Sequence, residues 1–421
     1  MQRFSIISLA MVLVVAIPLA AQGNYKIINL GTQGGTSSAA ISINDRGLIS
    51  GYSLLPGNTT SVAVVWQNGK ALPLGTLGGP NSGVFWPNHN ATAVVGIAET
   101  ADLDPLSEDW SCAHGGAFFP SVDHHICLGF VWQNGAMSPL PTLGGVNGYA
   151  GDANDLGQVV GWAETNFADS TCNSPQVLQF EAALWGPGPG QVQPLPPLAG
   201  DPDSAATAIN NKGQVVGISG ICEDAVGEQS AAHAVMWQNG IPTFLGSLGG
   251  PAAWNTPTAV NNVGQVAGFA LDPHGNFHAF LWTQAGMQDL QTLPGDVFSF
   301  AYAINDRGQV VGQSIGASGS RAFIWQNGVM TDLNCLAVPG SMPLIFANDI
   351  NNSGRIVGEA SDAGTGDAPA FVAVPIAGRN NCTGSAAPAM HAPVVLPKNI
   401  NSMLQKSGLL SRIGVEPRAP Q

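Results

Sequence analysis

Short apolar runs separated by turn residues recur along most of the chain. Residues 301–312 read AYAINDRGQVVG. Asn305 suits an Asx turn, and Gly308 suits the left-handed position of a type I turn with a G1 bulge, where a Cβ atom is strained. The pattern therefore predicts a tight β-hairpin. Closely similar sequences recur at 206–217, 40–51 and 347–358.

A second hairpin follows each of these. Apolar and polar residues alternate along RAFIW (321–325) and VMTDL (329–333), as in strands with one buried face. Asn-Gly pairs, which suit a two-residue type I′ turn, join such strands. These pairs are Asn68-Gly69, Asn134-Gly135, Asn239-Gly240 and Asn327-Gly328.

The repeat predicts the fold. The glycine that ends the first-hairpin motif marks seven copies of the repeat. These glycines are Gly51, Gly96, Gly161, Gly217, Gly268, Gly312 and Gly358. Two hairpins per copy give four strands, so the chain is predicted to be all-β, a seven-bladed β-propeller of four-stranded antiparallel blades. A solenoid fits less well because it would need caps. The second copy has Thr92 in place of the turn glycine, so an irregular turn is expected there.

The ends of the repeat region complement each other. The last copy supplies three strands, and the segment at 24–32 resembles the missing fourth. The N-terminal strand should therefore lie beside 368–376, complete the last blade and close the ring. A tryptophan in the third strand should fill each blade core, except that Ala373 takes its place in the last copy. The tryptophans are Trp66, Trp132, Trp185, Trp237, Trp282 and Trp325.

The combined motif A-x-A-I-N-x-x-G-x-V-V-G and H-A-F-x-W-x-x-x-G, with HAFLW intact at 278–282, resembles the bacterial HAF-repeat family of extracellular proteins. The resemblance covers about residues 24–378. It implies an exported propeller and no catalytic residues. The histidine of the motif is variable here, which favours a structural position at a strand rim. Its position holds His278 and His233, but also Arg321, Glu181 and Val62.

Three regions are predicted along the chain. Residues 1–21 combine Arg3, an apolar run and small residues before the end, as in a secretory signal peptide. The propeller should span 22–378, and the Pro- and Ala-rich tail at 379–421 should be mostly disordered. No stretch after the signal is long enough to span a membrane. We expect a secreted, extracellular or periplasmic protein.

The distribution of charge along the chain limits the classes of partner that we expect. Residues 22–378 contain 7 Lys and Arg against 26 Asp and Glu, whereas 379–421 contain 5 basic residues and 1 acidic residue. An acidic body repels phosphate backbones, so nucleic acid is not expected as a partner. A monomer is expected.

Six cysteines in an exported chain predict three disulfides. Cys112 and Cys127 flank one insertion and are predicted to pair. Cys172 and Cys222 occupy corresponding links of neighbouring copies, which leaves Cys335 for Cys382.

The insertions predict a binding face. In a four-stranded meander both hairpin turns lie on one face of the ring, and the links lie on the other. Copies two, three and four carry insertions in their links, and variable loops on a rigid scaffold are where binding normally resides. The expected contact residues are Trp110, Trp254, Asp104, Glu108, Asp109, His124 and His125.

Other interpretations of these residues remain open. The acidic and histidine side chains could form a metal site or a catalytic set, but no spacing matches an EF-hand or an HExxH motif. No cofactor or catalytic residue is therefore predicted. If these carboxylates hold an ion, calcium is the ion that suits them. Trp110 and Trp254 could instead pack over the insertions.

The leading hypothesis is an exported, non-enzymatic binding or cell-surface interaction protein with a glycan or protein ligand. The alternative is a secreted propeller hydrolase or lyase that acts on polysaccharide. A third hypothesis is a purely structural extracellular protein. The sequence does not name the ligand.

Overall fold

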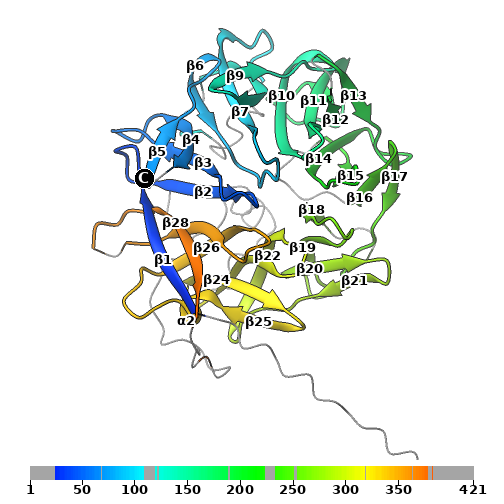
Figure 1. The fold of residues 1–421 in the computed structure, drawn as a ribbon. Helices are drawn as coiled ribbons and strands as arrows, with labels where there is room; N and C mark the ends of the chain where they lie inside the picture. Colours follow the sequence, from blue (N-terminus) through cyan, green and yellow to red (C-terminus); the bar gives the residue numbers. More distant parts are fainter. Residues whose placement is uncertain are drawn as a thin grey trace, which may run out of the picture.

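The computed structural model describes residues 24–67, 69–108, 119–120, 123–187, 190–222, 233–250, 254–317, 319–362, 364–377 and 382. Seven four-stranded antiparallel sheets are arranged as blades around a central axis (Figure 1). The predicted seven-bladed propeller is confirmed.

The first six blades are formed by strands consecutive in sequence. Blade 1 contains β2 (Ser38–Ile43), β3 (Ile49–Leu54), β4 (Ser61–Gln67) and β5 (Lys70–Pro73). Blade 2 contains β6 (Gly78–Gly83), β7 (Val94–Leu103), β8 (His125–Gln133) and β9 (Ala136–Pro139). Blade 3 contains β10 (Gly144–Ala153), β11 (Val159–Ala168), β12 (Leu178–Trp185) and β13 (Val192–Leu195).

The next three blades repeat this order. Blade 4 contains β14 (Asp203–Ile209), β15 (Gln214–Gly220), β16 (His233–Gln238) and β17 (Ile241–Phe244). Blade 5 contains β18 (Asn255–Val260), β19 (Val266–Leu271), β20 (Phe277–Thr283) and β21 (Gly286–Asp289). Blade 6 contains β22 (Asp296–Ile304), β23 (Val310–Gly316), β24 (Gly319–Gln326) and β25 (Val329–Asp332).

The N-terminal strand closes the ring. Blade 7 contains β26 (Leu344–Ile350), β27 (Ile356–Ala360) and β28 (Ala370–Ile376), with β1 (Asn24–Gly31) as its outer strand. β1 runs antiparallel to β28 and pairs Asn24 with Ile376 and Asn29 with Phe371. The predicted closure is therefore confirmed.

Two predicted disulfides are present. Cys172 pairs with Cys222 at a Cα–Cα distance of 4.7 Å, and Cys335 pairs with Cys382 at 5.9 Å. Cys335 lies in the short helix α2 (Leu333–Leu336) between blades 6 and 7. Cys127 also takes part in a disulfide, but its expected partner Cys112 lies outside the described residues.

The hairpin turns have the predicted chemistry. In blade 6 the Oδ1 atom of Asn305 accepts hydrogen bonds from the backbone N–H groups of Arg307 and Gln309, and Gly308 has a φ of 71°. In the irregular second copy the Asn90 side chain instead accepts from the N–H groups of Thr92 and Ala93. Type I′ turns, with positive φ at both residues, occur at Asn134-Gly135, Asn239-Gly240 and Asn327-Gly328.

The glycine that ends each opening motif allows close approach of two strands. A Cβ atom at Gly312 would overlap the carbonyl oxygen of Phe300 in the neighbouring inner strand and meet the Phe323 ring. The register of this strand pair shifts between Ala301 and Ala303, where a β-bulge turns the carbonyl toward the glycine.

We expect Gly312→Ala to lower the free energy of unfolding by about 1–3 kcal/mol, because the backbone must move to admit the methyl group. Urea denaturation followed by tryptophan fluorescence measures the change. Gly364→Ala is the matched control, because its Cβ would meet only a flexible Asp362 carboxylate oxygen. Equal effects of the two substitutions would contradict this explanation of the repeat.

Tryptophans join neighbouring blades. Trp66, Trp185 and Trp237 are buried. Their indole N–H groups donate to the carbonyl oxygens of Leu30, Pro141 and Pro196, which precede the blade that holds each tryptophan. Trp132 and Trp282 are partly buried, and Ala373 is buried at the equivalent position of blade 7.

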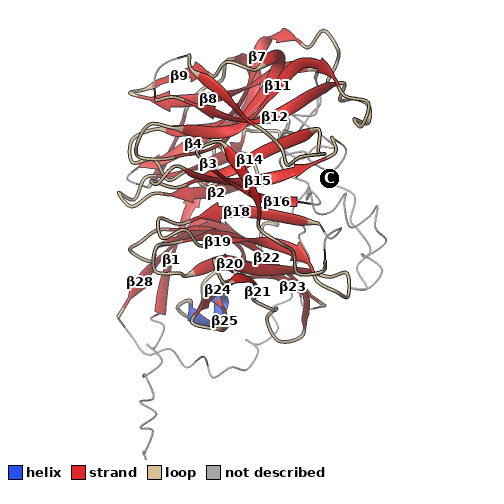
Figure 2. Ribbon diagram, turned by 90° about the vertical axis from the view of Figure 1, so that its right-hand side faces the viewer, coloured by secondary structure: helices blue, strands red, loops and turns tan. Residues whose placement is uncertain are grey.

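The ring has two faces, on which the connections between strands lie (Figure 2). The turn face carries the hairpin turns, between the first and second and between the third and fourth strands of a blade. The link face carries the insertions and the connections between blades. Within the described residues, no helix is long and apolar enough to cross a bilayer.

Candidate functional site

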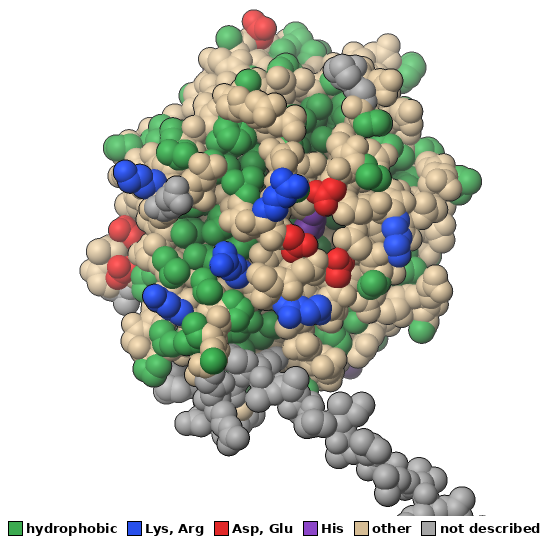
Figure 3. All heavy atoms as spheres, in the orientation of Figure 1, with side chains coloured by type: hydrophobic (Ala, Val, Ile, Leu, Met, Phe, Trp, Pro, Cys, Tyr) green, Lys and Arg blue, Asp and Glu red, His purple; other side chains and the backbone are tan. Residues whose placement is uncertain are grey.

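A cavity of about 430 Å³ opens on the turn face at the propeller axis. First-hairpin turns surround it, and Figure 3 shows acidic side chains and a histidine at this central hollow. We call this cavity the ring pocket. Its polar lining residues include Asn44, Asp45, Arg46, His89, Asn90, Thr92, Asp155, Asn210, Asn211, Asn261, Asn262, Asn305, Asp306, Asn351 and Asn352.

Seven asparagines form a closed belt around the ring pocket. Each turn uses its asparagine Oδ1 atom internally, which leaves the Nδ2 group to donate to the backbone oxygen of the asparagine in the next blade. The bonds run Asn44 to Asn90, Asn90 to Asn154, Asn154 to Asn210, Asn210 to Asn261, Asn261 to Asn305, Asn305 to Asn351 and Asn351 to Asn44. The asparagine repeated in each turn thus links neighbouring blades as well as stabilising its own hairpin.

A second belt lies at the next residue of each turn. Its side-chain Oδ1 atoms accept backbone N–H groups from the preceding blade, as in the 2.9 Å bond from Ala91 to Asp155. The acceptors are Asp45, Asp155, Asn211, Asn262, Asp306 and Asn352. Blade 2 interrupts this belt, because Ala91 has no side-chain oxygen. The interruption gives the pocket one chemically distinct side.

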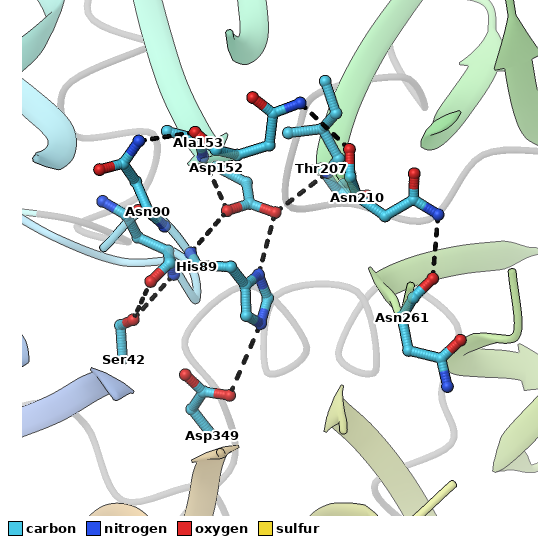
Figure 4. A network of polar contacts seen from close by, with 12 residues as sticks. Ser42, His89, Asn90, Asp152, Ala153, Thr207, Asn210, Asn261 and Asp349 are labelled. Carbon is cyan, nitrogen blue, oxygen red and sulfur yellow. Dashed lines mark hydrogen bonds and ion pairs between the residues drawn. The ribbon is translucent and has the colours of Figure 1, made fainter. Parts of the chain in front are cut away.

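The floor of the ring pocket is apolar except in blade 2. Five blades contribute a β-branched side chain, and His89 takes this position in blade 2. Its Nδ1 atom lies 3.2 Å from Oδ2 of Asp152, and its Nε2 atom lies 4.0 Å from Oδ1 of Asp349 (Figure 4). The apolar floor residues are Ile43, Ile209, Val260, Ile304 and Ile350.

The two carboxylates make His89 a cation. Burial alone would lower its pKa, but Asp152 and Asp349 outweigh burial and raise the pKa to about 10. Burial raises the pKa of Asp349 to about 6, although His89 and two backbone N–H groups act against it. At neutral pH, His89 is therefore an imidazolium between two buried carboxylates, with its side chain 32% exposed to the pocket.

This arrangement suits binding. The ring pocket combines amide donors and acceptors, carboxylates and a cation over an apolar floor, and such mixtures recognise polar small molecules. His89 is already held by carboxylates on both sides. The geometry suits recognition of a polar ligand.

The expected contact residues of the blade 2 insertion do not share one environment. Asp104 and Glu108 are buried. Glu108 Oε1 accepts backbone N–H groups from Val177 at 2.7 Å and Leu178 at 2.6 Å in blade 3, and Asp104 Oδ2 accepts from Asn147 Nδ2 at 2.6 Å. These carboxylates therefore fasten the insertion to blade 3.

The other expected residues are dispersed. His124 is exposed with a φ of 59°, and His125 Nε2 lies 4.0 Å from Asp123 Oδ2. Trp254 is partly buried and packs with the phenylalanine cluster of blades 5 and 6, so the structure does not bring it to these histidines. Asp109 and Trp110 lie outside the described residues.

Three further buried carboxyl groups lie toward the link face, and burial raises the pKa of each. The pKa of Glu99 is about 7, and the Asp123 carboxylate beside it adds to the effect. The pKa of Glu164 is also about 7, with Glu108 contributing, and that of Asp203 is about 9, with a hydrogen bond to Asp169 contributing. Asp203 and Asp169 thus share a proton at neutral pH.

Two other clusters have structural explanations. Asp169, Cys172 and Cys222 are close enough to hold a metal, but both sulfur atoms belong to a disulfide and offer no thiolate. In the variable histidine position, His278 pairs with Asp289 at 2.9 Å and His233 with Asp201 at 2.7 Å. Arg321 pairs with Asp296 at 2.8 Å and with Asp332 at 3.3 Å.

His89 was not among the predicted site residues. Its signal is a departure from the repeat: the second copy has histidine where five other copies have isoleucine or valine and the third has Ala153. Asp152 and Asp349 are parallel departures, because blades 4, 5 and 6 have Ala208, Ala259 and Ala303 at their position. The three departures meet only when the ring closes.

Similarity between this chain and known proteins is low. No family model matches the chain, and no curated protein sequence does. A solved Pyrococcus horikoshii acylaminoacyl peptidase matches with a TM-score of 0.40 and 12% identity, over 68% of this chain and 43% of that one. A puromycin-hydrolyzing peptidase from Mycobacterium tuberculosis matches with a TM-score of 0.45 and 11% identity, over 87% of this chain and 56% of that one.

A putative TolB from Agrobacterium tumefaciens matches with a TM-score of 0.36 and 11% identity, over 68% of this chain and 99% of that one. The chain spans about half the length of the two peptidases. These likenesses concern the propeller fold alone.

Proposed function

We propose that this protein is an exported, non-enzymatic binding propeller that takes a hydroxyl-rich ligand, such as a sugar residue, into the ring pocket. The observation that supports this proposal most directly is the cavity of about 430 Å³, which is lined by belts of amides and carboxylates around His89. Its volume lies within the range of roughly 300–1,000 Å³ usual for small-molecule sites. Export is supported by the disulfides and by the resemblance to HAF-repeat proteins.

The chemistry of the pocket matches a sugar. Hydroxyl groups both donate and accept, and side-chain amides and carboxylates can answer both roles. The β-branched floor offers an apolar surface for the C–H groups of a sugar ring. The belts hold the polar groups in place before binding, which reduces the entropy lost when a ligand is ordered.

The enzymatic alternative draws less support. A polysaccharide hydrolase needs two accessible carboxyl groups on either side of the scissile bond. Glu99, Glu164 and Asp203, whose pKa values burial raises, are 0% exposed. A substrate could not reach them without opening the blades. The accessible carboxylates of the ring pocket, Asp45, Asp155 and Asp306, each already accept a backbone N–H group.

The link face is the second candidate surface. Exposed apolar side chains gather at the strand ends beside its insertions, as Leu103, Phe167 and Ile221 show with exposures of 64%, 66% and 42%. Such side chains favour a protein ligand over a sugar. The test below therefore includes this surface.

We expect the full mature chain to bind at least one oligosaccharide on a glycan array. Asp155→Asn combined with Asp306→Asn should weaken that binding about tenfold, because each charge-assisted hydrogen bond to a hydroxyl is replaced by a weaker neutral one. Isothermal titration calorimetry measures the change. Asp102→Asn, an exposed residue at the link-face end of β7, is the matched control.

Binding that resists the pocket substitutions but disappears in a Phe167→Ser and Ile221→Ser variant would move the site to the link face. Release of reducing ends from the bound glycan would show turnover and would sink the non-enzymatic proposal.

A further inference from the structure

The basic residues of the propeller are concentrated on one face. Of the seven Lys and Arg residues within 22–378, five lie in or directly after hairpin turns of the turn face. They are Arg46, Lys70, Lys212, Arg307 and Arg355. Figure 3 shows basic side chains spread around the central hollow on this face.

Four of these residues lie on the neighbouring blades 6, 7 and 1. The Arg307 guanidinium in blade 6 lies beside Gly354 in the turn of blade 7, and the Arg355 guanidinium lies beside Gly47 in the turn of blade 1. Arg46 belongs to that same turn of blade 1, and Lys70 follows the second turn of blade 1. We call Arg46, Lys70, Arg307 and Arg355 the cationic arc.

The cationic arc is exposed, and its side chains form no ion pair in the described part of the chain. All four side chains are exposed, and none forms an ion pair with a carboxylate within the described residues. Arg321, away from the turn face, contrasts with them because it is partly enclosed and paired with both Asp296 and Asp332. A chain with so few basic residues thus leaves this group available to an external anion.

We propose that the cationic arc binds an acidic polysaccharide whose chain passes over the turn face beside the ring pocket. The inference rests on the proposed function and names its ligand class: a glycan that carries carboxylate or sulfate groups. Arg46 lines the ring pocket as well, so one chain can place a sugar in the pocket and its neighbouring anionic groups on the arc. Arginine is well suited to this role because its planar guanidinium binds carboxylate and sulfate with two parallel hydrogen bonds.

The overall negative charge does not prevent such binding. At physiological ionic strength the Debye length is about 8 Å, so carboxylates on the link face are largely screened from a ligand on the turn face. The carboxylates of the first-hairpin turns are Asp45, Asp155 and Asp306, and each already accepts a backbone N–H group in the second belt.

A membrane fits this face less well. Interfacial binding combines cations with apolar side chains that enter the acyl region. The most exposed apolar residues of the first-hairpin turns, Leu156 and Val263, are each 60% exposed and belong to blades 3 and 5. On the blades of the cationic arc, Val329 and Ile376 at the turn-face ends of β25 and β28 are exposed by 42% and 37%. The largest apolar exposures therefore lie away from the arc.

The test compares alginate, a polyuronate, with neutral dextran and with phosphatidylglycerol-containing vesicles, using the full mature chain. We expect salt-sensitive alginate binding that weakens roughly 10- to 100-fold between about 50 and 200 mM salt. The variant Lys70→Gln, Arg307→Gln, Arg355→Gln should lose about tenfold or more in alginate affinity. Arg46 is left in place because it lines the ring pocket.

Lys212→Gln is the matched control, since Lys212 is exposed on the same face but lies in blade 4. It should change alginate affinity by less than about twofold, as expected for a single surface charge. All variants keep the basic residues of the tail at 379–421, so binding by the tail cannot imitate the effect.

The outcomes separate this inference from the proposed function. Binding of a neutral glycan without preference for alginate would overturn the inference and leave the sugar-binding proposal standing. Failure of every glycan would overturn both. Equal losses in the triple variant and in Lys212→Gln would also overturn the cationic arc. Vesicle capture that needs the arc, without alginate binding, would identify a membrane as the partner and refute the polysaccharide.

Discussion

Replacing His89 by isoleucine should lower the free energy of unfolding by about 3–5 kcal/mol, although isoleucine is the residue that most other blades have at this position. The imidazolium lies 3.2 Å from Asp152 and 4.0 Å from Asp349, both of which are fully buried. Without it, two carboxylates remain at the axis with no countercharge. Thermal or urea unfolding of the full chain measures the loss.

A compensating variant tests the cause. Asp152→Ala and Asp349→Ala reproduce the alanines that blades 4, 5 and 6 have at the same position. Added to His89→Ile, they should recover most of the lost stability, because a buried ion cluster can often be exchanged for apolar side chains at little cost. The two aspartate substitutions in a chain that keeps His89 should not reach the stability of the triple variant, since they leave His89 without partners. If the triple variant is as unstable as His89→Ile, lost packing rather than unpaired charge explains the effect.

The fold could be predicted because the repeat records it seven times. Gly312 and its equivalents, the Asn-Gly turns and the third-strand tryptophans recur at the same positions of the repeat, and their structural requirements agree from blade to blade. The closure by 24–31 followed from a missing strand at one end and a surplus strand at the other. Local chemistry thus determined the global architecture.

The site could not be predicted in the same way. The turn asparagines were identified as turn formers, but their Nδ2 groups also bind the next blade, and only the closed ring reveals the second role. Asp104 and Glu108 were assigned to a contact surface because they lie in a variable insertion on a rigid scaffold. The structure buries them instead, since they accept N–H groups that the neighbouring loop and strand leave unpaired.

The buried acidic groups predict an unusual dependence of stability on pH. The pKa values of Glu99 and Glu164 are raised to about 7, and that of Asp203 is raised to about 9. Above about pH 4 the unfolded chain has released these protons, whereas the folded chain still holds them. Stability therefore falls as pH rises from about 4 to about 9, by up to about 1.4 kcal/mol per pH unit for each retained proton.

His89 acts in the same direction at higher pH. Its folded-state pKa is about 10, so its contribution is complete below the unfolded value of about 6.5 and is lost as pH rises through about 10. Asp169 and Asp272 act in the opposite direction at low pH, because hydrogen bonds lower their pKa values against the effect of burial. Their contribution is lost as pH falls below about 4. We therefore expect maximum stability near about pH 4.

Two isosteric substitutions should remove much of this dependence. Oε2 of Glu99 accepts hydrogen bonds from the backbone N and the Nδ2 group of Asn81 at 2.9 and 3.0 Å. In Glu99→Gln the amide oxygen can still accept both, and the new N–H group can donate to Asp123. In Asp203→Asn the oxygen can still accept from the Phe180 N–H at 3.0 Å, and the new N–H group can donate to Asp169. Each amide reproduces the protonated acid without a proton to lose.

Urea midpoints measured at about pH 5 and about pH 9 give the test. The folded parent keeps the proton at the lower pH, so the stability advantage of each variant should be small there and should grow by about 1–3 kcal/mol at the higher pH. Asp102→Asn removes the same charge from an exposed position on the same face. If it flattens the pH profile as much as Glu99→Gln does, net charge rather than the buried pairs governs the profile. A parent protein more stable at about pH 9 than at about pH 5 would contradict the retained protons themselves.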